Sequence, residues 1–157
     1  VFKLHDCINH KTCIDDALKE ARLICEEKGL RFTQIREFIL RMVWENHKPT
    51  KAYELLDKIP SMNYSPQPPT VYRALDFLLT NGFIHKINSL NAFVGCSHPL
   101  KHDECYFMIC RKCDEIKECC DDQITSVIKK KLDSSQFSSK NIAIEISGDC
   151  YECSKEL

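Results

Sequence analysis

The sequence of 157 residues has no long apolar run and no excess of charge of one sign. No window approaches the roughly 18 uninterrupted apolar residues that indicate a membrane-spanning helix. The chain also does not start with an apolar, signal-like run, so we expect a cytoplasmic protein with no membrane association. A formal net charge of −1 gives no bulk indication of nucleic-acid binding. If DNA is bound, the local placement of basic side chains must provide the attraction.

Cysteine, by contrast, is abundant. The chain has 11 cysteines, an odd number, and four of them form two C-x-x-C pairs, Cys110–Cys113 and Cys150–Cys153. Because nothing suggests export, metal ligation explains these pairs better than a disulfide framework does. The length allows one ordinary domain or two small ones, and a 43% apolar content is enough to build their cores.

Three helical patterns precede a proline-rich loop that we expect over residues 60–68. Each pattern opens on residues that favour a helix start. The starts are Asp15–Asp16, Thr33 and Pro49–Thr50, and the first helix is expected to stop at Gly29.

The stretch from Pro68 to Gly82 is the feature around which the rest of the chain is organised. Pro69 suits the first turn of a helix, and Asn81–Gly82 suits its end. Helical periodicity leaves Tyr72 and Arg73 on the side away from the apolar stripe, a face that fits the DNA major groove. A surface helix with a solvated polar face explains the same periodicity. The apolar stripe consists of Val71, Ala74, Leu75, Leu78 and Leu79.

Two short β-like runs, 83–87 and 92–96, flank a turn over 88–91 and predict a hairpin. Helices followed by a hairpin predict a winged helix-turn-helix, in which the helix before the hairpin reads DNA and the hairpin is the wing. The same fold also serves as a protein-interaction module, so the architecture alone does not settle the function.

Beyond a polar hinge over 97–104, the pattern predicts a small α+β unit. Strands are expected over 106–109 and 115–119, a helix from Asp121–Asp122, and a half-buried strand over Ile142–Ile146. So small a unit is marginal alone and needs a metal or a partner subunit. We therefore predict an α+β fold with a winged-helix DNA-binding domain over 1–96, the hinge, and a dimerisation and metal-binding domain over 105–157.

The two C-x-x-C pairs supply four thiolates, which complete a closed tetrahedral zinc site. Because 36 residues separate the pairs, such a site would join distant parts of the chain. Four thiolates leave no position for water, so the site is expected to be structural. The alternative is a pair of redox-active dithiols, but the thioredoxin-like βαβ context of such pairs is absent.

A second set of potential ligands lies on both sides of the hinge. Taken singly, each has a plain structural explanation; together they offer nitrogen, sulfur and oxygen donors that zinc accepts. A metal bound by them would fix the angle between the two domains. The set is His85, Cys96, His102 and Glu118. A further group near the start of the chain, His5, Cys7, His10 and Cys13, could bind a metal, but its spacing does not justify assigning a particular site.

Three stretches carry a resemblance to the ferric uptake regulator superfamily, and most closely to its zinc-sensing members. They are PPTVYRALDFLLTNGFIHK, CRKCDEIKE and GDCYEC. The resemblance implies a homodimeric repressor, not an enzyme, that binds A·T-rich inverted-repeat operators when zinc is replete, with about two zinc ions per protomer. It implies that the structural zinc ligands are Cys110, Cys113, Cys150 and Cys153, and the regulatory ligands His85, Cys96, His102 and Glu118. It implies DNA contacts by Tyr53, Thr70, Tyr72 and Arg73.

Departures from the family pattern leave alternatives open. Iron- and peroxide-sensing relatives carry a dense histidine cluster before the first C-x-x-C, where this chain has only His98 and His102; this favours zinc over iron or manganese, as does the soft ligand Cys96. Because the hinge is one residue longer than expected, His98 or Asp103 could replace His102. Regulation by iron, manganese or peroxide within the same family remains an alternative, as does a thiol redox switch. Such a switch would use Cys96, Cys105, Cys119 or Cys120.

Overall fold

The computed structural model describes residues 10–45, 48–59 and 67–155. Within these ranges the chain divides into two compact units, with the boundary between Ser97 and His98. We call residues 10–97 the N-terminal unit and residues 98–155 the C-terminal unit, and describe each by itself. None of their helices is long and apolar enough to cross a membrane.

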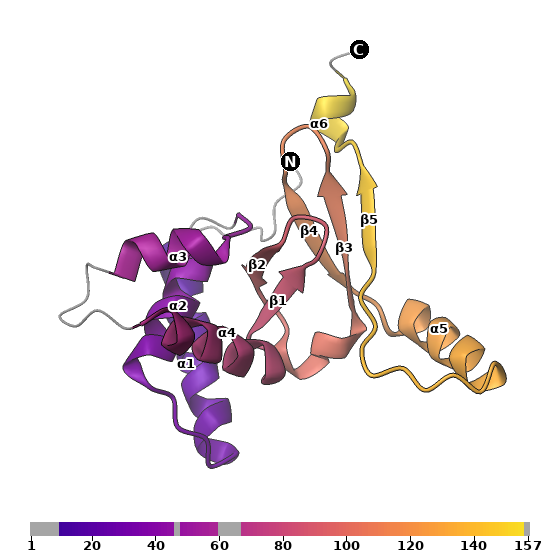
Figure 1. Ribbon diagram of the computed structural model, residues 1–157. Coiled ribbons are helices and arrows are strands. Elements are labelled where there is room, and N and C mark those ends of the chain that lie inside the picture. Colours follow the sequence, from indigo (N-terminus) through magenta and orange to yellow (C-terminus); the bar gives the residue numbers. More distant parts are fainter. Residues whose placement is uncertain (1–9, 46–47, 60–66, 156–157) are drawn as a thin grey trace. The chain divides into compact units, whose positions relative to one another are not determined.

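The N-terminal unit contains helices followed by a β-hairpin (Figure 1). This order confirms the predicted winged helix-turn-helix. The elements are α1 (His10–Glu27), α2 (Gln34–Trp44), α3 (Ala52–Lys58), α4 (Pro68–Thr80), β1 (Ile84–Ile87) and β2 (Ala92–Gly95). Most of the predicted loop over 60–68 lies outside the described residues.

Helix α1 begins at His10, so the predicted start at Asp15–Asp16 was wrong. The reason is tertiary packing. Ile14, one turn upstream of Leu18, is 9% exposed and extends the buried stripe toward the start of the helix. Burial of this extra turn outweighs the local preference of aspartate for a helix start.

Helix α4 has the predicted bounds. Pro68 and Pro69 occupy its first turn, and Gly82 follows the helix with a positive φ of 75°. Glycine adopts this left-handed conformation at little cost, which ends the helix there. Leu79, expected in the stripe, is only partly buried. The residues of the predicted stripe that are buried are Val71, Ala74, Leu75 and Leu78.

Backbone hydrogen bonds help to join the wing to the helical part of its unit. Beside the β1–β2 pair, Thr50 and Phe93 exchange backbone hydrogen bonds in both directions, each 2.8 Å long. This isolated bridge adds a third backbone segment to the hairpin. The orientation of the wing relative to α3, which starts two residues after Thr50, is therefore set by backbone hydrogen bonds.

The C-terminal unit has a three-stranded sheet of order β4-β3-β5, in which β3 pairs antiparallel with β4 and parallel with β5 (Figure 1). Its elements are η2 (Pro99–Glu104), β3 (Cys105–Cys110), β4 (Ile116–Cys120), α5 (Asp122–Ser134), β5 (Glu145–Gly148) and α6 (Tyr151–Ser154). The segment predicted as a hinge therefore forms the 3-10 helix η2 of this unit, where it contacts β4 and α5.

The last strand begins later than predicted. We expected a half-buried strand over Ile142–Ile146, but β5 starts at Glu145, where pairing with Phe107 of β3 begins. Ile146 is 50% exposed, and Val127 on α5 is 67% exposed. Alternation of apolar residues was correct, but the predicted burial of Ile146 is not present in the single chain. Both apolar side chains are thus exposed in the single chain.

Candidate metal centre and nucleic-acid interface

Both C-x-x-C pairs meet at one end of the sheet. Cys110 ends β3 and Cys113 lies in the following turn, while Cys150 and Cys153 belong to the start and body of α6. Parallel pairing of Cys110 with Gly148 brings the end of β5 beside the end of β3. All four sulfur atoms lie within 4.8 Å of one another. The sheet therefore brings together ligands that are far apart in the sequence.

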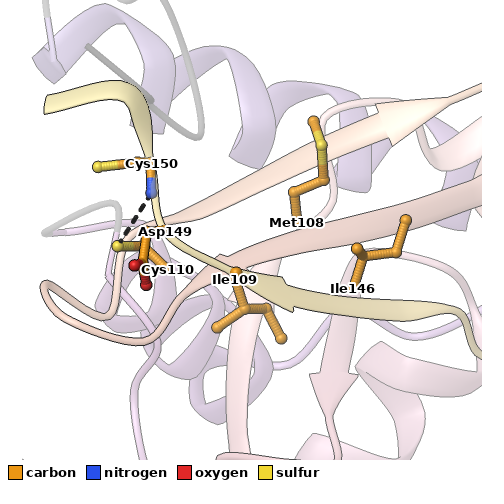
Figure 2. A pocket seen from close by; sticks show the side chains of 7 residues that line it. Met108, Ile109, Cys110, Ile146, Asp149 and Cys150 are labelled. Carbon is orange, nitrogen blue, oxygen red and sulfur yellow. Dashed lines mark hydrogen bonds between the residues drawn. The ribbon is translucent and has the colours of Figure 1, made fainter. Parts of the chain in front are cut away.

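Backbone amides stabilise the thiolate form of Cys110. The N–H of Cys150 donates to Cys110 Sγ at 3.3 Å, as the dashed line in Figure 2 shows. This bond, with further N–H groups of Cys113 and Lys112, lowers the pKa of the Cys110 thiol to about 6, although burial opposes the shift. Cys110 is thus prepared to carry negative charge.

The neighbouring Cys153 thiol keeps its proton more strongly. The pKa of Cys153 is raised far above its usual range, mainly by a hydrogen bond shared with Cys150 and then by burial. Without a cation, the four thiols of the cluster cannot all be ionised, because their negative charges would repel one another. A bound divalent metal would displace these protons, and four thiolates are a donor set that fits tetrahedral zinc.

Two basic side chains support the cluster from outside. Arg111 forms an ion pair with Asp149 at 3.4 Å, and Lys112 Nζ donates to the carbonyl of Cys153 at 2.8 Å. Both contacts connect the turn after β3 to the segment that carries α6. Beside the cluster lies a hollow of about 110 Å³ with apolar lining, in which Met108, Ile109 and Ile146 take part (Figure 2).

The predicted regulatory set has two of its members in each unit. In the N-terminal unit, His85 lies on β1 and Cys96 directly after β2. Because Ile84 pairs with Gly95, both side chains point to the same face of the hairpin. They are 7% and 3% exposed, and their ligand atoms lie within 4.8 Å of each other. A nitrogen and a sulfur donor are thus buried together.

The other two members belong to the C-terminal unit. His102 lies in η2 and Glu118 on β4, and both are partly buried. The alternatives His98 and Asp103 are exposed. A four-ligand site from these halves remains a prediction. In the early cysteine–histidine group, His5 and Cys7 lie outside the described residues, whereas His10 and Cys13 belong to α1.

Cys105 is a residue whose position sequence reasoning did not recognise. It forms a disulfide with Cys120, and its sulfur lies within 4.8 Å of a carboxylate oxygen of Glu118. The strand register pairs Cys105 directly with Cys120. A tight turn over residues 111–115, between the two strands predicted here, would have revealed this pairing, but cysteine spacing alone could not.

The predicted DNA-contacting residues lie on the surface of the N-terminal unit. Tyr72 is 50% exposed and Arg73 is exposed, both on α4 opposite its buried stripe. Tyr53 on α3 is 58% exposed. Thr70 is partly buried in the first turn of α4. The buried side of α4 thus holds the helix while its outer side presents an aromatic ring and a guanidinium group.

A winged-helix unit that precedes a unit with a four-cysteine cluster is the architecture of a metal-responsive regulator. The chain belongs to the ferric uptake regulator family, whose model matches residues 27–147.

Within this family, the similarity to zinc uptake regulators is extensive. The zinc uptake regulation protein of Escherichia coli (strain K12) is 35% identical over 146 residues, which cover 91% of this chain and 84% of that protein. The structure of holo XcZur is 40% identical with a TM-score of 0.82, covering 88% of this chain and 96% of that one. A zinc uptake regulator complexed with zinc and DNA is 32% identical with a TM-score of 0.81, covering 91% and 96%.

Proposed function

We propose that this protein is a zinc-responsive transcriptional repressor that binds an A·T-rich inverted-repeat operator as a homodimer. The observation that carries the proposal is the outer face of α4. Tyr72 and Arg73 are exposed on a helix whose opposite face is buried, in a chain that matches a regulator complexed with zinc and DNA over 91% of its length. A chromosomal operator also places the protein in the cytoplasm.

Recognition of DNA follows from the two faces of α4. The helix inserts into the major groove, because that groove is wide enough to admit a helix. Arg73 supplies the cation for a base edge or a phosphate, and Tyr72 an apolar ring with a hydroxyl group. Thr70 lies in the first turn, where helix N–H groups favour phosphate oxygen atoms. Tyr53 adds a contact from α3.

Zinc has two roles in this proposal, at about two ions per protomer. The first ion is held by Cys110, Cys113, Cys150 and Cys153. This closed donor set stabilises the C-terminal unit and catalyses nothing. This zinc ion compensates for the small hydrophobic core of the C-terminal unit, because metal binding in such units contributes directly to the free energy of folding.

The second ion regulates DNA binding. We infer that His85 and Cys96 from the N-terminal unit, with His102 and Glu118 from the C-terminal unit, form its site. A metal that needs donors from both units binds only arrangements that bring them together, so it shifts the population toward those arrangements. A shift from 1:99 to 99:1 requires about 5.5 kcal/mol of differential binding.

Dimerisation brings two copies of α4 to one operator. The C-terminal unit exposes apolar side chains that a second copy can cover, among them Val127, Phe137 and Ile146. A symmetric dimer matches an inverted repeat, because the twofold axis of the protein coincides with that of the DNA.

The test is operator binding as a function of metal. A fluorescent duplex with an A·T-rich inverted repeat is titrated with apo protein in the presence of zinc, iron(II) or manganese(II), and anisotropy is measured. Zinc should promote binding at lower free concentration than the other two ions. If iron(II) or manganese(II) promotes binding and zinc does not, the protein is a regulator of the same family for another metal.

A further inference from the structure

Cys105 and Cys120 face each other across two neighbouring strands. They occupy opposed positions in the β3–β4 register, their Cα atoms are 4.0 Å apart, and their sulfur atoms are bonded. Cys105 is 6% exposed, whereas Cys120 is partly exposed. In the reduced pair, a small oxidant can therefore reach the Cys120 thiol, and the buried Cys105 thiol lies beside it.

The other cysteines of the C-terminal unit are committed elsewhere or are badly placed to compete. Cys119 is next to Cys120, but alternation along β4 puts its side chain on the opposite face, where it pairs with Tyr106. In the N-terminal unit, Cys25 and Cys96 are buried and Cys13 is partly exposed. The sulfur atoms of the metal cluster are those of Cys110, Cys113, Cys150 and Cys153.

The disulfide lies next to a proposed regulatory ligand. Cys120 Sγ is 3.9 Å from Glu118 Oε1, and Cys105 Sγ is 3.4 Å from the carbonyl oxygen of Lys101 in η2. Cys105 follows η2 directly. The sulfur atoms of this pair therefore lie next to both the carboxylate of Glu118 and the segment that carries His102.

We propose that Cys105 and Cys120 form a reversible peroxide-modification site whose oxidation weakens regulatory zinc binding. The Cys120 thiolate attacks one oxygen of hydrogen peroxide, the O–O bond breaks, and a sulfenic acid and hydroxide form. Cys105 sulfur then attacks the sulfenic sulfur and displaces its hydroxyl group. The hydroxide ions take up the two thiol protons, so two thiols and one peroxide give one disulfide and two waters. A dithiol reductant reverses the modification.

The effect on zinc, which rests on the proposed regulatory site, follows from the position of the sulfur atoms. Cys105 Sγ lies within 4.8 Å of a carboxylate oxygen of Glu118, and Cys120 Sγ lies 3.9 Å from Glu118 Oε1. The reduced pair places soft donors beside this ligand, whereas the disulfide ties the same sulfur atoms to each other. Because the loss of a partner beside a ligand typically lowers metal affinity about 10- to 100-fold, oxidation should lower zinc affinity at least about tenfold.

Peptide mapping tests the modification. The full-length protein with its structural zinc is treated with hydrogen peroxide, alkylated, digested and analysed by mass spectrometry. A linked Cys105–Cys120 peptide that a dithiol removes is expected in the wild type and in the matched control Cys119→Ser, but not in Cys120→Ser. Loss of structural zinc before any such link forms, or a link through Cys119, would overturn the assignment. The wild-type map decides this without any variant.

Zinc titration of the reduced and oxidised wild type tests the consequence. The second zinc ion should bind at least about tenfold more weakly after oxidation, and Cys119→Ser should respond like the wild type. Equal affinities would overturn the regulatory effect. If neither form binds a second zinc ion, the proposed function fails, while the mapped disulfide remains.

Discussion

Gly95 of the wing lies directly against the indole ring of Trp44 in α2. A methyl group built on Gly95 would meet three atoms of that ring, with Trp44 Cδ2 at 2.7 Å. Trp44 is itself 5% exposed, so it has little room to move. The hairpin and the helical part of the N-terminal unit thus approach each other so closely that only glycine fits.

Gly95→Ala should therefore destabilise the N-terminal unit, by about 1–3 kcal/mol, because overpacking forces side chains or backbone to shift. Trp44 is the sole tryptophan of the chain, so its fluorescence in a denaturant titration reports on this unit. Gly148→Ala is the matched control, since a methyl group there would meet nothing within 4 Å. Equal midpoints for Gly95→Ala and wild type would contradict the close contact.

Arg73→Ala should weaken operator binding by at least about tenfold, the loss expected when an arginine leaves a base or phosphate contact. Its effect on folding should be small, because Arg73 is exposed. Lys130→Ala removes the same charge from an exposed position of α5 and serves as the control. Anisotropy titrations at fixed salt compare the two variants. Equal weakening by both would show that net charge, and not α4, determines affinity.

Cys110→Ser should remove the structural zinc ion and loosen the C-terminal unit. Serine cannot supply the thiolate that backbone amides stabilise at this position. Metal analysis should show one zinc fewer per protomer, and hydrogen exchange should show lost protection in β3 and β5. The control Cys119→Ser lies outside the cluster, so it should keep the structural zinc ion and the protection of β3 and β5. If Cys110→Ser retained all of its zinc, the assignment of the structural zinc site to the four cysteines would be wrong.

His102→Ala should abolish zinc-dependent operator binding while the structural zinc ion stays in place. His98→Ala is the matched control, since His98 is an exposed histidine next to the same 3-10 helix. Zinc stoichiometry and operator affinity are measured on both variants. The opposite pattern, with loss in His98→Ala alone, would transfer the ligand role to His98.

Helix α4 and the hairpin were predictable because local signals and packing agree. Pro69 and Gly82 mark the ends of the helix, and the periodic stripe between them faces the core. The start of α1 was missed because it depends on burial of Ile14, which is a tertiary effect. The start of β5 was missed because the apolar alternation continues upstream to Ile142, whereas the described hydrogen bonds to β3 begin at the carbonyl of Ile144.

Among the site residues, too, local sequence patterns predicted some features, whereas others depend on tertiary structure. C-x-x-C spacing alone indicates the metal cluster, because each pair needs only one turn to bring its sulfur atoms together. The Cys105–Cys120 pair depends on strand register, which a cysteine pattern does not contain. The shared face of His85 and Cys96 likewise follows only once the hairpin register is known.

The most direct test of zinc-responsive repression measures metal content per protomer before and after mild chelation, with operator binding followed on the same samples. The account predicts about two zinc ions, one resistant to the chelator and one removable, with operator binding lost and regained together with the removable ion. A single tightly held zinc ion, with operator binding unchanged by chelation and by added zinc, would contradict it.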